Sequence, residues 1–294
     1  MKKVVIDESF LSRLEQLETV LKNNVAGMFG GNRRSRNFGS SCEFADYRDY
    51  MPGDDVTKID WNAYARFDKL YQKLYFDERQ MHTRIYIDVS RSMIHGGDDK
   101  AVAAIRLAAA FAYLSVSEMD KVSIYAIRGG SLEEVIVGMV GKDSYLNCVG
   151  KLNELEFDSD SRISEAIVPS SVGRGDGYSI IISDFLTDEN YEAAIDRLAE
   201  QKRDILCVQI LSREELNPQF RGKMHLFDSE DQSKFFRKKI DQDVVRAYKD
   251  ALKYVTDRIR LYCESRGGQY FLAPAHAELS EIFLEKFVNL GVVK

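Results

Sequence analysis

The fold of this chain is decided by residues 84–93, which read RIYIDVSRSM. The first half is a short apolar run that ends in Asp88, and this pattern is typical of a buried strand. The loop after it has the spacing D-x-S-x-S, which comprises Asp88, Ser90 and Ser92. An alanine-rich segment, apolar nearly all round, follows at residues 101–116. A strand, a loop and a buried helix in succession predict one unit of an open α/β sheet.

The same pattern returns at residues 178–184, YSIIISD, where a second apolar run ends in Asp184. Further strands are expected at residues 70–76, 122–127, 135–137, 205–211 and 269–272, and further helices at 9–26, 145–155, 163–168, 190–201, 244–266 and 279–290. Strands that are apolar on both faces and alternate with helices predict a mostly parallel sheet covered on both sides.

We therefore predict an α/β fold with a doubly wound, mostly parallel sheet flanked by helices. An N-terminal helix and a small β-rich extension are expected within residues 1–80, packed on a main domain of residues 81–294. Residues 40–80 differ from the rest because they are dense in aromatic and charged side chains, with a turn at Met51-Pro52-Gly53.

Composition bounds the class of protein. The chain has 294 residues, of which 45% are hydrophobic and 30% charged, and this balance is typical of a soluble globular protein. A net charge of -6 argues against a dedicated nucleic-acid binder, so no nucleic-acid partner is expected. Two basic runs, at residues 33–36 and 234–239, are interpreted as solvated surface or a partner-facing patch.

The cysteines and the apolar stretches point to the cytoplasm. The four cysteines are scattered in sequence, so neither a zinc-type nor a redox-type pair is present. Residues 1–7 become charged too early for the apolar core of a signal peptide. The longest apolar stretch, at 101–116, is shorter than the roughly 20 residues that span a bilayer, so no transmembrane segment is expected.

The predicted strands that end in Asp88 and Asp184 hold the side chains best suited to bind a cation. In a parallel sheet, Asp88 and Asp184 would emerge at the same edge, where they repel each other unless a positive charge lies between them. Carboxylate and hydroxyl oxygens are hard donors that suit Mg²⁺ first, and also Mn²⁺ or Ca²⁺, rather than zinc. The serines have a second interpretation, as caps of the following helix.

Together these residues resemble the metal-ion-dependent adhesion site of von Willebrand factor A domains, whose fold is related to the Rossmann type. The resemblance implies that Asp88, Ser90, Ser92 and Asp184 are metal ligands. Ser161 takes the position of a threonine ligand of that family, although the glycines that normally precede it are absent. In such a site, the partner protein completes the coordination sphere with an acidic side chain.

The segment before the sheet resembles the signature of a bacterial family catalogued as domain of unknown function 58. The matching pattern is E-F, R-x-Y-x-P-G-D-D, I-D-W and A-R, between residues 43 and 66, and looser matches follow at 211–218 and 225–230. Its polar and aromatic members are Arg48, Asp54, Asp55, Asp60, Trp61 and Arg66. They are interpreted either as a structural network of ion pairs and turns, with a core tryptophan, or as a surface that contacts a partner.

This resemblance implies a metal-dependent protein-binding module that acts with a MoxR-type AAA+ ATPase, and not an enzyme. The alternative is a metal-dependent hydrolase, a phosphatase or nuclease that uses Asp88 and Asp184. His95 is close in sequence and would serve there as an acid or base, or is simply solvated. A third interpretation is a structural domain whose metal site stays empty.

Overall fold

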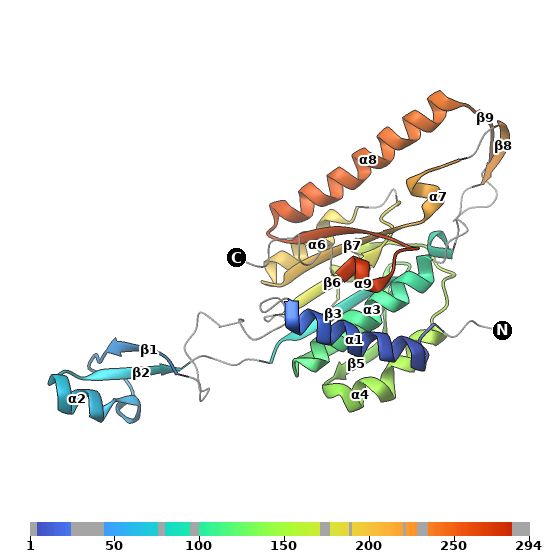
Figure 1. Cartoon of the computed structure of the whole chain (residues 1–294). Helices are drawn as coiled ribbons and strands as arrows, with labels where there is room; N and C mark the ends of the chain where they lie inside the picture. The colour runs from blue at the N-terminus through green and yellow to red at the C-terminus, as the bar shows by residue number, and fades with distance from the viewer. Residues whose placement is uncertain are drawn as a thin grey trace.

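A six-stranded sheet forms the centre of the chain (Figure 1). The computed structural model describes residues 5–24, 44–75, 80–94, 100–170, 177–187, 190–219, 222–227 and 235–283. The strand order is β10-β7-β6-β3-β4-β5, with bounds β3 (His82–Asp88), β4 (Lys121–Arg128), β5 (Ser131–Met139), β6 (Tyr178–Ser183), β7 (Asp204–Leu211) and β10 (Gln269–Pro274). All neighbours are parallel except β4 and β5, which pair antiparallel at the edge. The predicted doubly wound, mostly parallel sheet is confirmed.

Helices cover both faces of this sheet because its strands are apolar on both sides. One face packs on α1 (Glu8–Asn24), α3 (Lys100–Ser117), α4 (Gly141–Cys148), the 3-10 helix η3 (Val149–Glu154) and the region of α9 (Leu279–Glu281). The other face packs on α5 (Ile163–Ile167), α6 (Glu192–Glu200) and α8 (Gln242–Ser265). On β3, Ile85 and Ile87 enter the first core and Tyr86 the second, as strand alternation requires.

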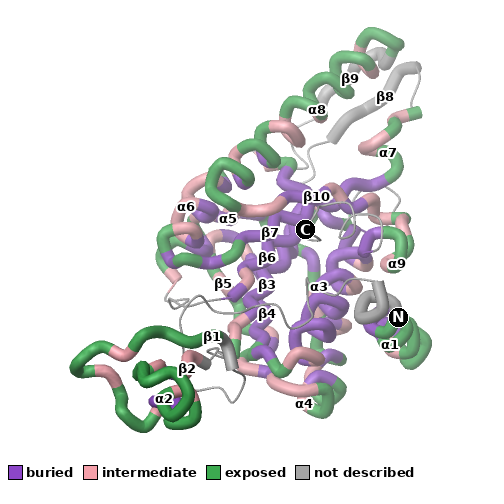
Figure 2. The backbone as a smooth tube through the Cα atoms, turned by 60° about the vertical axis from the view of Figure 1, so that its left-hand side comes forward, coloured by how far each residue is buried: buried purple, intermediate pink, exposed green. Residues whose placement is uncertain are grey.

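The central helix α3 is a core helix. Within the described ranges it is the one helix that is long and apolar enough to cross a membrane, and 83% of that length is buried inside the fold. Figure 2 shows it among the buried elements beside the sheet. Small alanine side chains, such as Ala104, Ala108 and Ala112, let the helix approach the sheet closely.

The N-terminal helix packs on the main domain. Phe10, Leu14 and Leu17 lie on one face of α1 and enter the core cluster that α3 shares. The segment before the helix is held by Asn153, whose Oδ1 accepts hydrogen bonds from the backbone N–H groups of Val5 and Ile6, both at 2.9 Å.

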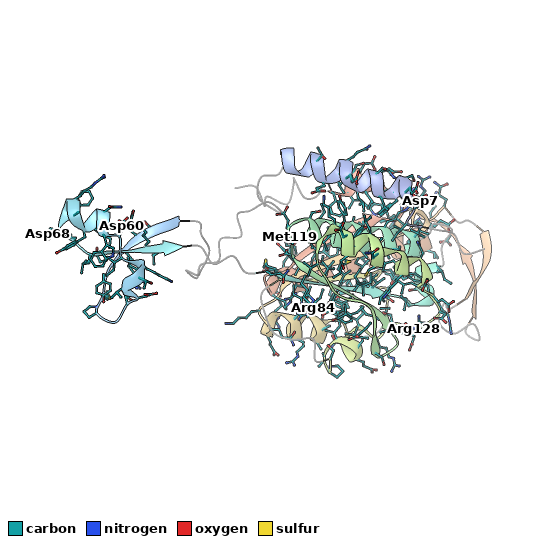
Figure 3. All side chains as sticks on the ribbon, turned by 90° about the horizontal axis from the view of Figure 1, so that it is seen from below. Asp7, Asp60, Asp68, Arg84, Met119 and Arg128 are labelled. Atoms are coloured by element: carbon teal, nitrogen blue, oxygen red, sulfur yellow. The ribbon has the colours of Figure 1, made fainter. Side chains whose placement is uncertain are left out.

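The signature segment was expected to pack there too, but its described part stands apart from the sheet in Figures 1 and 3. It consists of β1 (Phe44–Asp49), η1 (Val56–Lys58), α2 (Trp61–Phe67) and β2 (Tyr71–Tyr75), with β1 and β2 paired antiparallel. Polar side chains of this segment bond to one another, and large apolar side chains, including Trp61 and Phe67, are exposed on its surface. Those side chains are therefore not part of the core of the main domain.

A projecting arm follows β7. It comprises α7 (Arg213–Leu216), the hairpin of β8 (Gly222–Phe227) and β9 (Phe235–Ile240), and the exposed first half of α8. In Figure 1 the arm extends beyond the sheet. Within α8, the buried residues are Ile259 and Cys263, in the last turns of the helix. The basic run predicted at 234–239 falls mostly on β9, whereas the run at 33–36 and His95 lie outside the described residues.

Several element boundaries differ from the expectations. Residues 145–155 do not form one helix, because α4 ends at Cys148 and a 3-10 helix that contains Gly150 continues to Glu154. The helix expected at 279–290 is described only through residue 283. The hairpin of β8 and β9 and the short helices α2 and α7 were not predicted, since their sequences lack the long apolar periodicity of core elements.

Candidate cation site at the carboxyl edge of the sheet

Asp88 is the centre of the candidate site. It is the last residue of β3, and only 1% of its surface is exposed. Its Oδ1 accepts a hydrogen bond from the Ser90 N–H at 2.9 Å. Its Oδ2 accepts one from the Ser161 hydroxyl at 2.8 Å and one from the Ser183 hydroxyl at 2.6 Å. The carboxylate thus accepts hydrogen bonds from one backbone amide and two hydroxyls, which come from three separate segments of the chain.

Burial raises the pKa of Asp88, and the nearby negative charge of Asp184 raises it further, while hydrogen bonds from Ser183 and Ser90 lower it in part. Both main causes act against the ionised form of the carboxyl group. An added cation beside Asp88 would remove this penalty. The electrostatics of the edge therefore favour a positive ligand.

The D-x-S-x-S loop is held by backbone contacts to the loop that carries Ser161. Arg91 N–H donates to the Ser159 carbonyl at 2.8 Å, and Ser159 N–H donates to the Val89 carbonyl at 3.3 Å. The hydroxyls of Ser90 and Ser92 lie 2.9 Å apart. This pairing of two loops is what brings Ser161, 73 residues away in sequence, onto Asp88.

Asp184 follows β6, the neighbour of β3 in the sheet. Its Oδ1 accepts from the Leu186 N–H at 3.0 Å, and its carbonyl accepts from the Gln209 side chain at 2.8 Å. Gln209 is held in turn by the Tyr270 hydroxyl at 2.7 Å. Adjacent parallel strands thus place Asp184 beside Asp88, as the sequence predicted, and only 2% of its surface is exposed.

A lysine also belongs to this edge, and the sequence analysis missed it. Lys100 is the first residue of α3, is 1% exposed, and donates from Nζ to Asp184 Oδ2 at 2.9 Å and to Glu215 Oε1 at 2.6 Å. Burial acts to lower the pKa of Lys100, but the charges of Asp184 and Glu215 outweigh it and raise the pKa overall. The ammonium group is therefore charged and is bonded to both carboxylates.

Two further residues were missed. Ser183 donates a hydrogen bond to Asp88, and Glu215 accepts one from Lys100. Signals for both exist in the sequence. Ser183 precedes Asp184 in the S-D pair, and Glu215 occupies the acidic position of the looser family match at 211–218. No local pattern marked Lys100, because a charged residue at the start of an apolar helix is usually solvated.

The donor set fits a hard divalent cation. In the described ranges, no three His, Cys, Asp or Glu side chains gather in a metal-binding arrangement, so such a cation would depend on hydroxyls together with carboxylates. A cation at this edge would meet the carboxylates of Asp88, Asp184 and Glu215, which carry three negative charges when all are ionised, and Lys100, which carries one positive charge. The sum is two negative charges. One divalent ion balances that charge. The structure thus brings together all five predicted ligands, Asp88, Ser90, Ser92, Ser161 and Asp184.

The signature residues form a separate network. Arg48 pairs with Asp54 at 2.7 Å, Asp55 caps η1 through the Thr57 N–H, and Asp60 caps α2. Asp60 also accepts from the Tyr47 hydroxyl at 2.7 Å and pairs with Lys73 at 3.2 Å. In Figure 3, Asp60 lies within this segment, well away from Arg84 in the sheet.

Two signature residues take no part in that network. Trp61 is 61% exposed and Arg66 is exposed too, so the interpretation of Trp61 as a core aromatic is wrong. The structural interpretation holds for the four other residues, Arg48, Asp54, Asp55 and Asp60.

Comparison with known proteins supports the resemblance noted from the sequence. A family model described as "Protein of unknown function DUF58" matches residues 46–256. Uncharacterized proteins of Mycobacterium tuberculosis and Mycobacterium bovis are each 24% identical over 229 residues, which cover 76% of this chain and 72% of the relative.

Solved structures with a similar chain course include an aerotolerance-related membrane protein of Bacteroides fragilis (TM-score 0.42, 16% identity, covering 72% of this chain and 98% of that one). They also include the VWA domain of SpRpn10 (TM-score 0.40, 11% identity, covering 71% and 95%). At these scores the assignment of the fold rests on the sheet order and the helix layers described above.

Proposed function

Because this chain belongs to the DUF58 family, we propose that it is a non-catalytic protein-binding module whose carboxyl sheet edge binds a divalent cation, Mg²⁺ first. The observation that carries the proposal is the environment of Asp88, a buried carboxyl group with a raised pKa that lies next to a second acid, Asp184. It accepts hydrogen bonds from the Ser90 amide and from the hydroxyls of Ser161 and Ser183. Such an arrangement is stabilised by a positive ligand.

When bound, the cation would supply a coordination position for a carboxylate of a partner protein. The residues of the chain have separate tasks around it. Asp88 and Asp184 would hold the charge, and Ser90, Ser92 and Ser161 would supply neutral oxygens. Neutral hydroxyls leave the cation more electrophilic than a site built of carboxylates alone, so an exposed Asp or Glu of the partner is the preferred additional ligand.

The first test is cation binding by the free protein. Titration with Mg²⁺ in a melting experiment should raise the melting temperature of the wild type, since a ligand of the folded state stabilises it by mass action. Asp88→Asn should abolish the rise, because it removes the central charge. Asp143→Asn, an exposed acid on α4, should leave the rise unchanged. A wild type that ignores Mg²⁺ up to millimolar concentration contradicts the proposal.

The partner is proposed from the family resemblance. We expect a MoxR-type AAA+ ATPase that presents an acidic side chain, in the cytoplasm. A pull-down with purified ATPase, Mg²⁺ and nucleotide should retain this protein, and both EDTA and Asp88→Asn should release it. Retention that persists in EDTA would mean that binding does not use the cation edge.

The hydrolase alternative uses the same acids, so it is tested on the same variants. We expect no turnover of generic phosphomonoesters or single-stranded DNA with Mg²⁺ or Mn²⁺. Turnover that disappears in Asp88→Asn would assign catalysis to this edge in place of binding.

A further inference from the structure

The position of Lys100 is unfavourable for a lysine in two respects. It begins α3, so its positive charge faces the positive end of the helix dipole. It is also 1% exposed, and burial opposes its charge. Specific partners must offset these costs. Among the described residues, Lys100 pairs with two carboxylates far along the chain, Asp184 directly after β6 and Glu215 on α7.

The two carboxylates have different environments. Asp184 is a predicted cation ligand, and its Oδ2 is the atom that Lys100 contacts, at 2.9 Å. Glu215 lies on α7 at the start of the projecting arm, and Ser212 fixes it, since Ser212 N–H donates to Glu215 Oε2 at 2.7 Å. Lys100 thus lies between the candidate cation edge and the arm.

We infer that Lys100 is an internal cation of the site, that Glu215 offsets its charge, and that this pair sets the affinity of the edge for a divalent ion. The inference rests on the proposed cation site. With Lys100 and Glu215 both charged, the four groups Asp88, Asp184, Glu215 and Lys100 leave two negative charges for the ion. Removing the lysine charge leaves three, and removing the Glu215 charge leaves one.

The charge count gives an ordered prediction for Mn²⁺ affinity, measured by isothermal titration in Mg²⁺-free buffer. Lys100→Met keeps most of the apolar stem and should tighten binding at least about tenfold. Glu215→Gln keeps a side chain that can still close the capping box, and should weaken binding at least about tenfold. The double variant restores two negative charges and should return close to the wild type.

This order separates an electrostatic role from a structural one. If Lys100 and Glu215 only hold the loops in place, both single variants weaken binding and the double variant is weakest. Lys121→Met is the matched control. Lys121 is exposed at the start of β4, so it lies at the amino-terminal ends of the strands, away from the candidate site at their carboxyl ends. This substitution should leave the affinity unchanged. Circular dichroism of each variant verifies the fold.

The outcomes distinguish the inference from the proposed function. Opposite changes in the two single variants, with recovery in the double variant, support the inference. Wild-type binding that both single variants leave unchanged, or weaken together, overturns the inference while the cation site stands. No binding by the wild type or by any variant overturns the cation site and the inference with it.

Discussion

His82 illustrates how neighbouring residues set the protonation of a single side chain. Its ring Nε2 lies 2.8 Å from the Ser123 hydroxyl, at the amino edge of the sheet. Burial, together with the positive charges of Arg84, Lys121 and Arg203, lowers its pKa from 6.5 to about 4. The folded protein therefore holds this histidine neutral at pH values where an unfolded chain binds a proton.

This yields a prediction for the pH dependence of stability. The contribution of His82 is complete above pH 6.5 and is lost as the pH falls from 6.5 towards 4, because the unfolded state takes up the proton first. A fall of this size in pKa corresponds to about 3.4 kcal/mol, and partial exposure to solvent reduces it to about 1 to 2 kcal/mol.

Urea unfolding at pH 7 and pH 5 measures this contribution. The free energy of unfolding of the wild type should fall by that amount more than that of His82→Gln, which cannot take up the proton. Equal pH dependence in the two proteins would show that His82 does not titrate between these pH values on unfolding.

At the scale of elements, one short helix fixes the member of the site that is most remote in sequence. The four-residue helix α7 is closed by a capping box in which the Ser212 hydroxyl accepts from the Glu215 N–H at 3.1 Å and the Glu215 side chain accepts from the Ser212 N–H. The same glutamate reaches Lys100. The cap therefore stabilises α7 and orients Glu215 together.

Loss of this cap should loosen α7. Ser212→Ala is expected to cost about 1 kcal/mol and to speed hydrogen exchange of the α7 amides, while the sheet amides stay protected. Ser212→Asp is the control, because aspartate is an equally good cap. Faster exchange in both variants would contradict a role for the cap.

The signature segment is a second element with its own acid dependence. Hydrogen bonding from Tyr47, followed by backbone contacts and Lys73, lowers the pKa of Asp60 to about 2. A lowered pKa means that Asp60 stabilises the segment above about pH 4, and that this stabilisation is lost as the pH falls through 2.

The one tryptophan of the chain, Trp61, directly follows this cap and gives a local readout. Its indole N–H resonance should shift between pH 4 and pH 2 in the wild type and in Asp68→Asn, a neighbouring exposed site. The shift should be absent in Asp60→Asn. A shift that survives in Asp60→Asn would assign the transition to another acid.

At the scale of the whole molecule, the buried core and the exposed apolar side chains belong to different parts. The sheet and its two helix layers hold most of the buried side chains, whereas the signature segment and the first half of α8 are largely exposed (Figure 2). Trp61 and Phe67 are 61% and 66% exposed, and Phe111 in α3 is 1% exposed.

This division predicts unequal effects of similar substitutions. Trp61→Ala and Phe67→Ala should each change the free energy of unfolding of the main domain by less than about 0.5 kcal/mol. Phe111→Ala should cost about 3 to 5 kcal/mol, because it leaves a cavity in the core. Chemical unfolding followed by circular dichroism measures both. A large loss in Trp61→Ala would mean that the segment packs on the main domain after all.

The sequence by itself determined the elements and the edge where chemistry gathers. Apolar runs that end in Asp88 and Asp184, separated by buried helices, are local patterns, and a parallel sheet must bring such strand ends together. The sequence pattern and the family resemblance also indicated the two serines of the D-x-S-x-S loop and Ser161 as candidate ligands. The backbone pairing of the two loops agrees with that prediction.

Only the tertiary structure decided which charges meet. Lys100 is separated by 84 residues from Asp184 and by 115 from Glu215, and no periodicity links positions so far apart. The position of the signature segment and the exposure of Trp61 were likewise not local properties. The physical reason is that hydrophobic patterning acts over a few residues, whereas ion pairing and solvent exposure depend on which elements pack side by side.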